Sequence, residues 1–207
     1  MPDGEPTARP ATVSGELEEW LAGDGEKTLG GLVAHFDRKS FAIAFVLLLA
    51  LPALPLPTGG ATHVLEIVAV VLALQLVAGR DEIWIPRRWR SLQLAGEGRG
   101  RLLAGLLKLI RGLERFSRPR LRFVFNHRLT NLVFGLLVIA GCAGAFFAPP
   151  FTGLDTLPSL GVVLLSLGVL LEDVAIVVLG VLVGAVGIAL EVVLGSAAVR
   201  GVTSLFS

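Results

Sequence analysis

Long apolar stretches divide this chain of 207 residues into two halves. The first half has two such stretches, residues 40–54 and 63–78, and the second half has three, residues 129–148, 157–171 and 174–199. Because each stretch is apolar on all sides of a helix, each predicts a helix that is buried in protein or in a membrane. The pattern therefore predicts an all-α protein.

The two stretches of the first half are short for a membrane crossing. Each has about 15 or 16 residues, which gives roughly 24 Å of helix against a hydrocarbon core of about 30 Å. They either cross with help from their flanking residues or form a re-entrant hairpin. In the second half, residues 129–148 are long enough to span, whereas residues 157–171 are again short.

A shared motif separates the stretches within each half. Residues 55–62 (PLPTGGAT) and 149–156 (PPFTGLDT) have the common frame P-x-x-T-G-x-x-T. We interpret the frame as an internal duplication. It predicts two related halves, arranged as an inverted repeat, with helical hairpins that are Pro/Gly-broken or re-entrant. In transporters, paired interruptions of this kind mark a binding site. The alternative is a tight turn between two apolar helices.

Composition points to a membrane. The chain is 54% hydrophobic and 17% charged, with a mean hydropathy of +0.77, which is far more apolar than an ordinary soluble domain. We therefore expect a multi-pass integral membrane protein.

Basic charge is concentrated between the two halves. Residues 80–128 hold 13 of the 18 Lys and Arg residues. By the positive-inside rule this segment is cytoplasmic. The preceding hairpin must then return to its starting side, which places the N-terminus in the cytoplasm as well. The side of the C-terminus stays open, because it depends on whether the second half makes three passes.

Within this basic segment, leucines recur at helical spacing from Leu102 to Leu113. Such an amphipathic helix is expected to lie on the membrane surface, with its leucines in the acyl boundary and its cations toward anionic headgroups. The cations expected to bind lipid headgroups are Arg101, Lys108, Arg111 and Arg115. Because the helix has a continuous apolar face, nucleic-acid binding is not expected.

Polar residues within and beside the apolar stretches are the candidates for a binding site. An ionisable group inside a membrane is costly and usually faces a bundle interior or water. The candidate substrate-binding residues are Pro57, Thr58, Gly59, Thr62, His63, Glu66 and Gln75 in the first half, and Thr152, Gly153, Asp155, Thr156, Glu172 and Asp173 in the second. Glu191 is a further carboxyl group in the last stretch.

Some of these residues also have a structural explanation. Glu66 lies about one turn after Thr62, so the two could address one cavity. Asp155 could instead cap the helix that follows it. Glu172 and Asp173 could form an ordinary turn between two helices.

Familiar catalytic patterns are missing from the sequence. His35, His63 and His127 are far apart, so no metal site is expected. Cys142 stands alone in an apolar stretch and is interpreted as a small packed hydrophobe. No order of Ser, His and Asp indicates nucleophilic catalysis, and no phosphate-binding loop follows a strand. We expect no catalytic residue, metal or cofactor, although an enzyme acting on lipid-linked sugars stays open.

A series of short segments occurs in a characteristic order. They are residues 51–59 (LPALPLPTG), 74–80 (LQLVAGR), 84–86 (WIP), 149–152 (PPFT), 157–158 (LP) and 167–173 (LGVLLED). In this order they resemble the exopolysaccharide synthesis ExoD family, over residues 28–195. The resemblance implies a bacterial inner-membrane protein associated with exopolysaccharide production. It implies no established reaction.

Two functions from different classes follow. The first is transport or flipping of a small ion or a lipid-linked saccharide, with the helix N-termini after Gly59 and Gly153 offering amides to an anionic group. The second is a non-transporting membrane scaffold or partner of a polysaccharide synthesis complex. Such a scaffold would use the GxxxG face of Gly180 and Gly184, which lets another helix approach closely.

The expected organisation has five segments. They are a polar tail with a surface helix (1–27), a first membrane repeat (28–79), a basic interfacial segment (80–128), a second membrane repeat with the last transmembrane helix (129–199) and a C-terminal tail (200–207). The expected partners are membrane lipids, polysaccharide synthesis proteins and further copies of this chain. A homodimer or higher homo-oligomer is expected because a few short helices enclose little interior alone.

Overall fold

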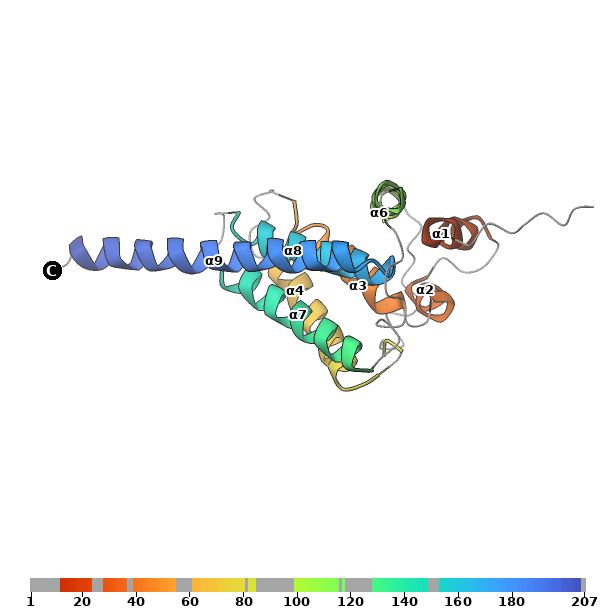
Figure 1. The fold of residues 1–207 in the computed structure, drawn as a ribbon, viewed down its shortest axis with the longest axis horizontal. Coiled ribbons are helices and arrows are strands. Elements are labelled where there is room, and N and C mark those ends of the chain that lie inside the picture. Colours follow the sequence, from red (N-terminus) through yellow and green to blue (C-terminus); the bar gives the residue numbers. More distant parts are fainter. Residues whose placement is uncertain are drawn as a thin grey trace, which may run out of the picture.

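A computed structural model describes residues 12–23, 28–36, 39–54, 61–80, 82–84, 99–115, 117, 128–148 and 153–205 of the chain. These residues form eight helices, and none of them forms a strand. The expectation of an all-α protein is therefore confirmed for the described part of the chain. Figure 1 shows the helices of the apolar stretches packed as a bundle and the remaining helices gathered at one end of it.

The five apolar stretches of the sequence each form a helix of the bundle. They are α3 (Ser40–Leu49), α4 (Ala61–Val77), α7 (Arg128–Phe147), α8 (Thr156–Leu170) and α9 (Val174–Leu205). The longest, α9, has 32 residues and is about 48 Å long. Its C-terminal part projects beyond the other helices (Figure 1).

The shortest of the five, α3, lies at the centre of the bundle. Every residue from Ser40 to Val46 is buried, and the helix contacts α4, α6 and α8. Phe45 packs edge-on against Phe134 of α7, with 5.6 Å between the ring centroids. A ten-residue helix that is apolar on every side has no face suited to water, which explains its central position.

Glycines bring α8 and α9 into close contact. A Cβ added to Gly161 would lie 2.5 Å from the backbone of Gly184, and one added to Gly180 would lie 2.4 Å from the backbone of Leu165. These contacts leave no room for a side chain. The prediction that the GxxxG motif lets another helix approach closely thus holds, and the helix that approaches is α8 of the same chain.

Helices α4 and α7 run antiparallel. Near the start of α7, a Cβ on Gly135 would meet Ala73 and Val77 at the end of α4. At the opposite ends of the same helices, the rings of His63 and Phe146 lie 5.0 Å apart. The start of α4 and the end of α7 therefore lie together.

The described residues that flank the two interruptions of the apolar sequence therefore lie at one end of the bundle, which we call the break end. The interruptions themselves, residues 55–60 and 149–152, lie outside the described residues. The hairpin formed by α3 and α4 and the hairpin formed by α7 and α8 point the same way. An inverted repeat would point them in opposite directions, so the helices do not support the expected inversion. They are two hairpins in the same orientation.

Three helices cover the opposite end of the bundle, and we call them the surface layer. They are α1 (Val13–Ala22), α2 (Leu29–Phe36) and α6 (Arg99–Glu114). Leu17 of α1 and Ile110 of α6 are fully buried. Burial of these apolar side chains contributes to holding the layer together and against the bundle.

Polar contacts also join α1 to α6. The Glu114 carboxylate accepts a hydrogen bond from the Ser14 amide at 3.0 Å and another from the Ser14 hydroxyl. Arg111 pairs with Glu18. Each carboxylate in these contacts has a donor, and both contacts lie at partly exposed positions.

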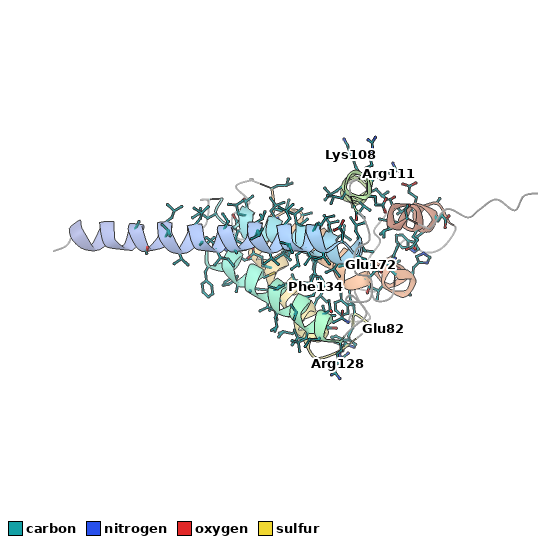
Figure 2. All side chains as sticks on the ribbon, in the orientation of Figure 1. Glu82, Lys108, Arg111, Arg128, Phe134 and Glu172 are labelled. Atoms are coloured by element: carbon teal, nitrogen blue, oxygen red, sulfur yellow. The ribbon has the colours of Figure 1, made fainter. Side chains whose placement is uncertain are left out.

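The apolar face of α6 packs on protein where it is described. Ile110 is fully buried, and Leu107 and Leu113 are half-buried against the core. The cations Lys108 and Arg111 lie on the outer side of the helix (Figure 2). At these positions the residues expected to enter the acyl boundary instead contact the surface layer and α3, while the basic face is exposed.

The outer faces of the bundle are apolar. On α4 a stripe of Val64, Ile67, Val71 and Leu74 is more than half exposed. Within the described residues, α7 and the Val174–Ala197 part of α9 are long and apolar enough to cross a membrane. Only 33% and 17% of these two stretches are buried in protein, whereas the core helix of a soluble protein is mostly buried. This exposure favours a membrane environment.

Candidate functional site

The break end contains a carboxyl group that is sealed within the bundle. Glu66, in the second turn of α4, is 1% exposed. Its Oε2 atom lies 3.0 Å from Nδ1 of His63, which is three residues earlier on the same face of the helix. Its Oε1 atom is buried and has no hydrogen-bond partner among the described residues. A buried acceptor without a partner is costly, which makes this position a candidate for a binding site.

Helix α7 lies beside the pair of His63 and Glu66. Cys142 is 1% exposed and lies within electrostatic range of Glu66. Phe146 lies against the His63 ring, and the His63 side chain is 27% exposed. His63 is therefore more accessible from outside the bundle than Glu66 is. The sequence interpretation of Cys142 as a packed residue agrees with its burial.

Asp155 brings a second carboxyl group to the break end. It occupies the position before the first residue of α8, but its side chain makes no capping hydrogen bond. Its backbone carbonyl accepts a hydrogen bond from the amide of Ser159 at 3.2 Å. The charge of Asp155 acts on both Glu66 and Glu191. The capping role considered from the sequence is therefore not what its carboxylate does.

Glu191 of α9 is the third carboxyl group. Its side chain lies against Gly144 of α7, since a Cβ on that glycine would be 3.6 Å from Oε2 of Glu191. Its Oε1 atom is buried and has no hydrogen-bond partner in the described part of the chain. Glu191 also lies within electrostatic range of Glu66. We call Glu66, Asp155 and Glu191, together with His63, the carboxyl cluster.

The cluster carries more negative than positive charge. Three carboxyl groups are brought together, and among the described residues the basic group paired with them is His63. Burying charges of like sign is expensive unless they are neutralised by a proton or a cation. Among these same residues, no group of three or more His, Cys, Asp or Glu side chains could hold a metal ion.

Three candidates from the sequence lie elsewhere. Gln75 holds the segment after α4, because its Oε1 accepts from the Trp84 amide at 2.8 Å and its Nε2 donates to the Trp84 carbonyl at 3.4 Å. Glu172 and Asp173 form the turn between α8 and α9, at the end opposite the breaks (Figure 2). Asp173 caps α9 by accepting a hydrogen bond from the Ala175 amide at 2.9 Å. These contacts give the three residues structural roles.

The remaining candidates flank the breaks. Thr62 is 1% exposed at the start of α4. Gly153 has a φ of 69°, a conformation that favours glycine, and its carbonyl accepts from the amide of Thr156, the first residue of α8. The candidates Pro57, Thr58, Gly59 and Thr152 lie outside the described residues. So does the Arg101 side chain, whereas Lys108, Arg111 and Arg115 are exposed on or just after α6.

Glu191 and Ser159 were not predicted as site residues from the sequence. Glu191 is distant in the sequence from both breaks, and only the packing of α9 against α7 brings it near them. Ser159 is 1% exposed, and its hydroxyl has no hydrogen-bond partner among the described residues. Its position one turn after Asp155 on α8 was the signal available in the sequence.

Comparison with known proteins identifies relatives. The sequence model of the family described as "Exopolysaccharide synthesis, ExoD" matches residues 13–193. An uncharacterized protein of Synechocystis sp. is 30% identical over 167 residues, which cover 79% of this chain and 77% of the relative. Protein ExoD of Rhizobium meliloti is 29% identical over 189 residues, which cover 82% of this chain and 78% of the relative. No solved structure matches the chain.

Proposed function

The chain belongs to the exopolysaccharide synthesis ExoD family, and from this premise we propose that it is a bacterial inner-membrane protein that moves a small ion across the membrane in support of exopolysaccharide production. The alternative cargo named from the sequence is a lipid-linked saccharide. The observation that carries the proposal is the carboxyl cluster at the break end.

Buried carboxyl groups with unpartnered oxygens are expensive to maintain. Packing alone would be better served by apolar side chains of similar volume. In membrane proteins, ionisable residues inside the apolar region usually belong to an ion pathway or a proton relay. Oε1 of Glu66 and Oε1 of Glu191 are both buried without a hydrogen-bond partner among the described residues, and they belong to different halves of the chain. This supports a site built jointly by the two halves.

The sign of the charge favours a cation over an anionic saccharide. The N-termini of α4 and α8 both point to the break end, as the sequence analysis expected for a site that receives an anionic group. Those helix ends already have carboxylates beside them, from Glu66 and Asp155. A further anion would be repelled by the cluster, whereas a small cation would be attracted.

The proposed orientation places the surface layer and the N-terminus on the cytoplasmic side and the break end on the other. The end of α4 and the start of α7 both lie away from the break end, and residues 80–128 between them hold 13 of the 18 Lys and Arg residues. The positive-inside rule supports a cytoplasmic location for that segment. At 20 residues, α7 has a length of about 30 Å, which matches the hydrocarbon core.

Replacement of Glu66 tests the proposal. We expect Glu66→Gln to abolish exopolysaccharide production in a strain that depends on this chain, while the protein inserts in the membrane at the wild-type level. Glu82→Gln is the matched control, because Glu82 is exposed after the end of α4. Normal production by Glu66→Gln would contradict a functional cluster. If Glu66→Gln is lost from the membrane, Asp155→Asn provides the test, because it removes a less buried carboxylate of the same cluster.

The scaffold hypothesis is weakened by the packing of α9. The face of Gly180 and Gly184 that a scaffold would present is occupied by Gly161 and Leu165 of α8. A scaffold would then have to use the surface layer, where Lys108 and Arg111 are exposed. Under that hypothesis, Lys108→Glu with Arg111→Glu abolishes exopolysaccharide production and Glu66→Gln does not. The transport proposal expects the reverse.

A further inference from the structure

We propose that the carboxyl cluster is a proton-binding site, in which Glu66 takes up a proton from water at the break end by way of His63, and Glu191 of α9 completes the site. The inference rests on the proposed function in one respect, since it identifies the small ion as a proton. It is carried by the burial of Glu66, by the position of His63 and by the two carboxylate oxygens that have no hydrogen-bond partner among the described residues.

The site has more acidic than basic groups. Fully ionised, Glu66, Asp155 and Glu191 would place three negative charges in a largely apolar surrounding, with His63 as the one basic partner among the described residues. Such an arrangement needs a neutralising cation. Among the described residues, no group of three or more His, Cys, Asp or Glu side chains could hold a metal ion. A proton needs a single oxygen, and Oε1 of Glu66 has no hydrogen-bond partner among the same residues.

A proton can reach the buried Glu66 through His63. The Glu66 side chain is 1% exposed, whereas His63 is 27% exposed and contacts it at 3.0 Å. A protonated His63 can transfer the proton on Nδ1 to Oε2 of Glu66, which converts imidazolium and carboxylate into neutral imidazole and carboxylic acid. His63 then recovers a proton from water. The net result is the uptake of one proton by the cluster, with no other reactant.

Titratable groups of three other segments lie within electrostatic range of Glu66. They are Cys142 of α7, Asp155 at the start of α8 and Glu191 of α9. Helix α3, which also packs against α4, has no titratable side chain. The carboxyl groups facing Glu66 therefore come from two separate helices of the second half. Movement of α8 or α9 relative to α4 would change how firmly the proton is held.

The Glu191 side chain is positioned by α7. Its side chain lies where Gly144 leaves room, and the neighbouring Ile188 fills the rest of that contact, 2.7 Å from where a Cβ on the glycine would be. Glu191 is thus held at the break end by α7. Its Oε1 has no hydrogen-bond partner among the described residues and gives the cluster a second position that can accept a proton. The charge of Glu66 acts on Glu191, so the protonation of one depends on that of the other.

Infrared spectroscopy of the purified full-length protein in lipid bilayers tests the inference, because the carbonyl band of a protonated, buried carboxyl group is resolved from that of a carboxylate. We expect the wild-type protein to show this band at neutral pH. Glu66→Gln and Glu191→Gln should each remove or shift it, and Glu82→Gln and Glu172→Gln should leave it unchanged. His63→Gln should retain a band and slow the exchange of its proton for deuterium. Circular dichroism of each variant checks that the helices are intact.

Two outcomes would overturn the proton assignment. One is the lack of a protonated carboxyl band in the wild-type protein at neutral pH. The other is a band that sodium ions remove at constant pH, which would identify a metal cation as the occupant. If the band behaves as expected but Glu66→Gln still supports exopolysaccharide production, the proton site stands and the proposed function fails. If Glu66→Gln loses production and the wild type has no band, the proposed function stands and the proton assignment fails.

Discussion

Acidic side chains have opposite environments at the two ends of the bundle. In the surface layer, Glu114 accepts hydrogen bonds from the Ser14 amide and hydroxyl at partly exposed positions. At the break end, Glu66 is almost completely buried and one of its oxygens has no hydrogen-bond partner among the described residues, while Asp155 and Glu191 add further acidic groups. The first arrangement is what stability alone would select. The second reduces stability, and we infer that it is retained because the protein uses it.

This contrast separates stability from activity in a way that mutations can test. A buried carboxyl group without a partner is a source of strain, so its neutral analogue should fold at least as well. A paired carboxyl group contributes modestly to stability, so its neutral analogue should fold slightly less well. We therefore expect the replacement of a carboxyl group by its neutral analogue to change stability in opposite directions at the two ends of the bundle.

The largest effect is expected from Asp155→Asn or Glu191→Gln. Each removes one carboxylate from the cluster and keeps the shape of the side chain. We expect loss of exopolysaccharide production in a complementation assay, with thermal stability in detergent equal to or above that of the wild type, because like charges no longer repel. A variant that loses production and also melts earlier would show that these carboxylates serve the fold and would remove the contrast.

The second effect is expected where α7 meets α9. A Cβ on Gly144 would lie 2.7 Å from Ile188, so Gly144→Leu must displace α9 and with it Glu191. Overpacking of this kind costs about 1–3 kcal/mol, and activity should fall as well. Gly105→Ala on α6 is the control, because nothing lies within 4 Å of a Cβ there. Equal melting temperatures and activities in the two variants would show that α9 is not held by α7.

A smaller effect is expected from Glu114→Gln in the surface layer. The change weakens two hydrogen bonds to Ser14 that a charged acceptor strengthens, at a cost of about 1–2 kcal/mol. Hydrogen exchange in α1 should accelerate, while exopolysaccharide production stays normal. Ser14→Ala should reproduce part of the acceleration. Unchanged exchange in both variants would mean that α1 is held by the burial of Leu17 alone.

The smallest effect is expected from Glu18→Gln. Its partner Arg111 is 59% exposed and Glu18 is 41% exposed, so water and salt screen the pair. Exposed pairs contribute at most about 1 kcal/mol, and we expect no change in activity. The effect on hydrogen exchange in α1 should be detectable at low ionic strength and vanish in high salt. An effect that persists in high salt would indicate that the pair is less exposed than the structure shows.

Much of the helical fold could be predicted from the sequence. Each of the five apolar stretches became a helix, and the Gly180 and Gly184 motif correctly predicted a close helix contact. Periodicity is a local property, so it identifies helices well. It does not determine which way two hairpins point. The contacts between α4 and α7 do not support the expected inverted repeat. The partner of the GxxxG motif could not be predicted either, because the motif indicates a close approach and does not identify the approaching helix.

The candidate site was only partly predictable. His63 and Glu66 were separate candidates in the sequence, and their contact at 3.0 Å was not predicted. The repeated motif led to the prediction of Asp155 as a candidate. Glu191 is linked to them by tertiary packing against Gly144, which no local pattern encodes. Conversely, Gln75 looked like a site residue because it is polar in an apolar stretch, yet it holds the backbone of Trp84. Burying a polar residue in such a stretch costs free energy in either role. That cost alone therefore does not distinguish a binding residue from one that holds the backbone in place.

The most direct test of the central claim is the labelling of single cysteines by a membrane-impermeant thiol reagent added from each side, in a Cys142→Ala background. The sites are His63→Cys and Leu154→Cys at the break end and Lys108→Cys in the surface layer. The account predicts that both break-end cysteines are labelled from the outer face and that Lys108→Cys is labelled from the cytoplasmic face only. Labelling of all three from the same face, or no labelling at either break-end position, would contradict a water-accessible site formed by the two breaks together.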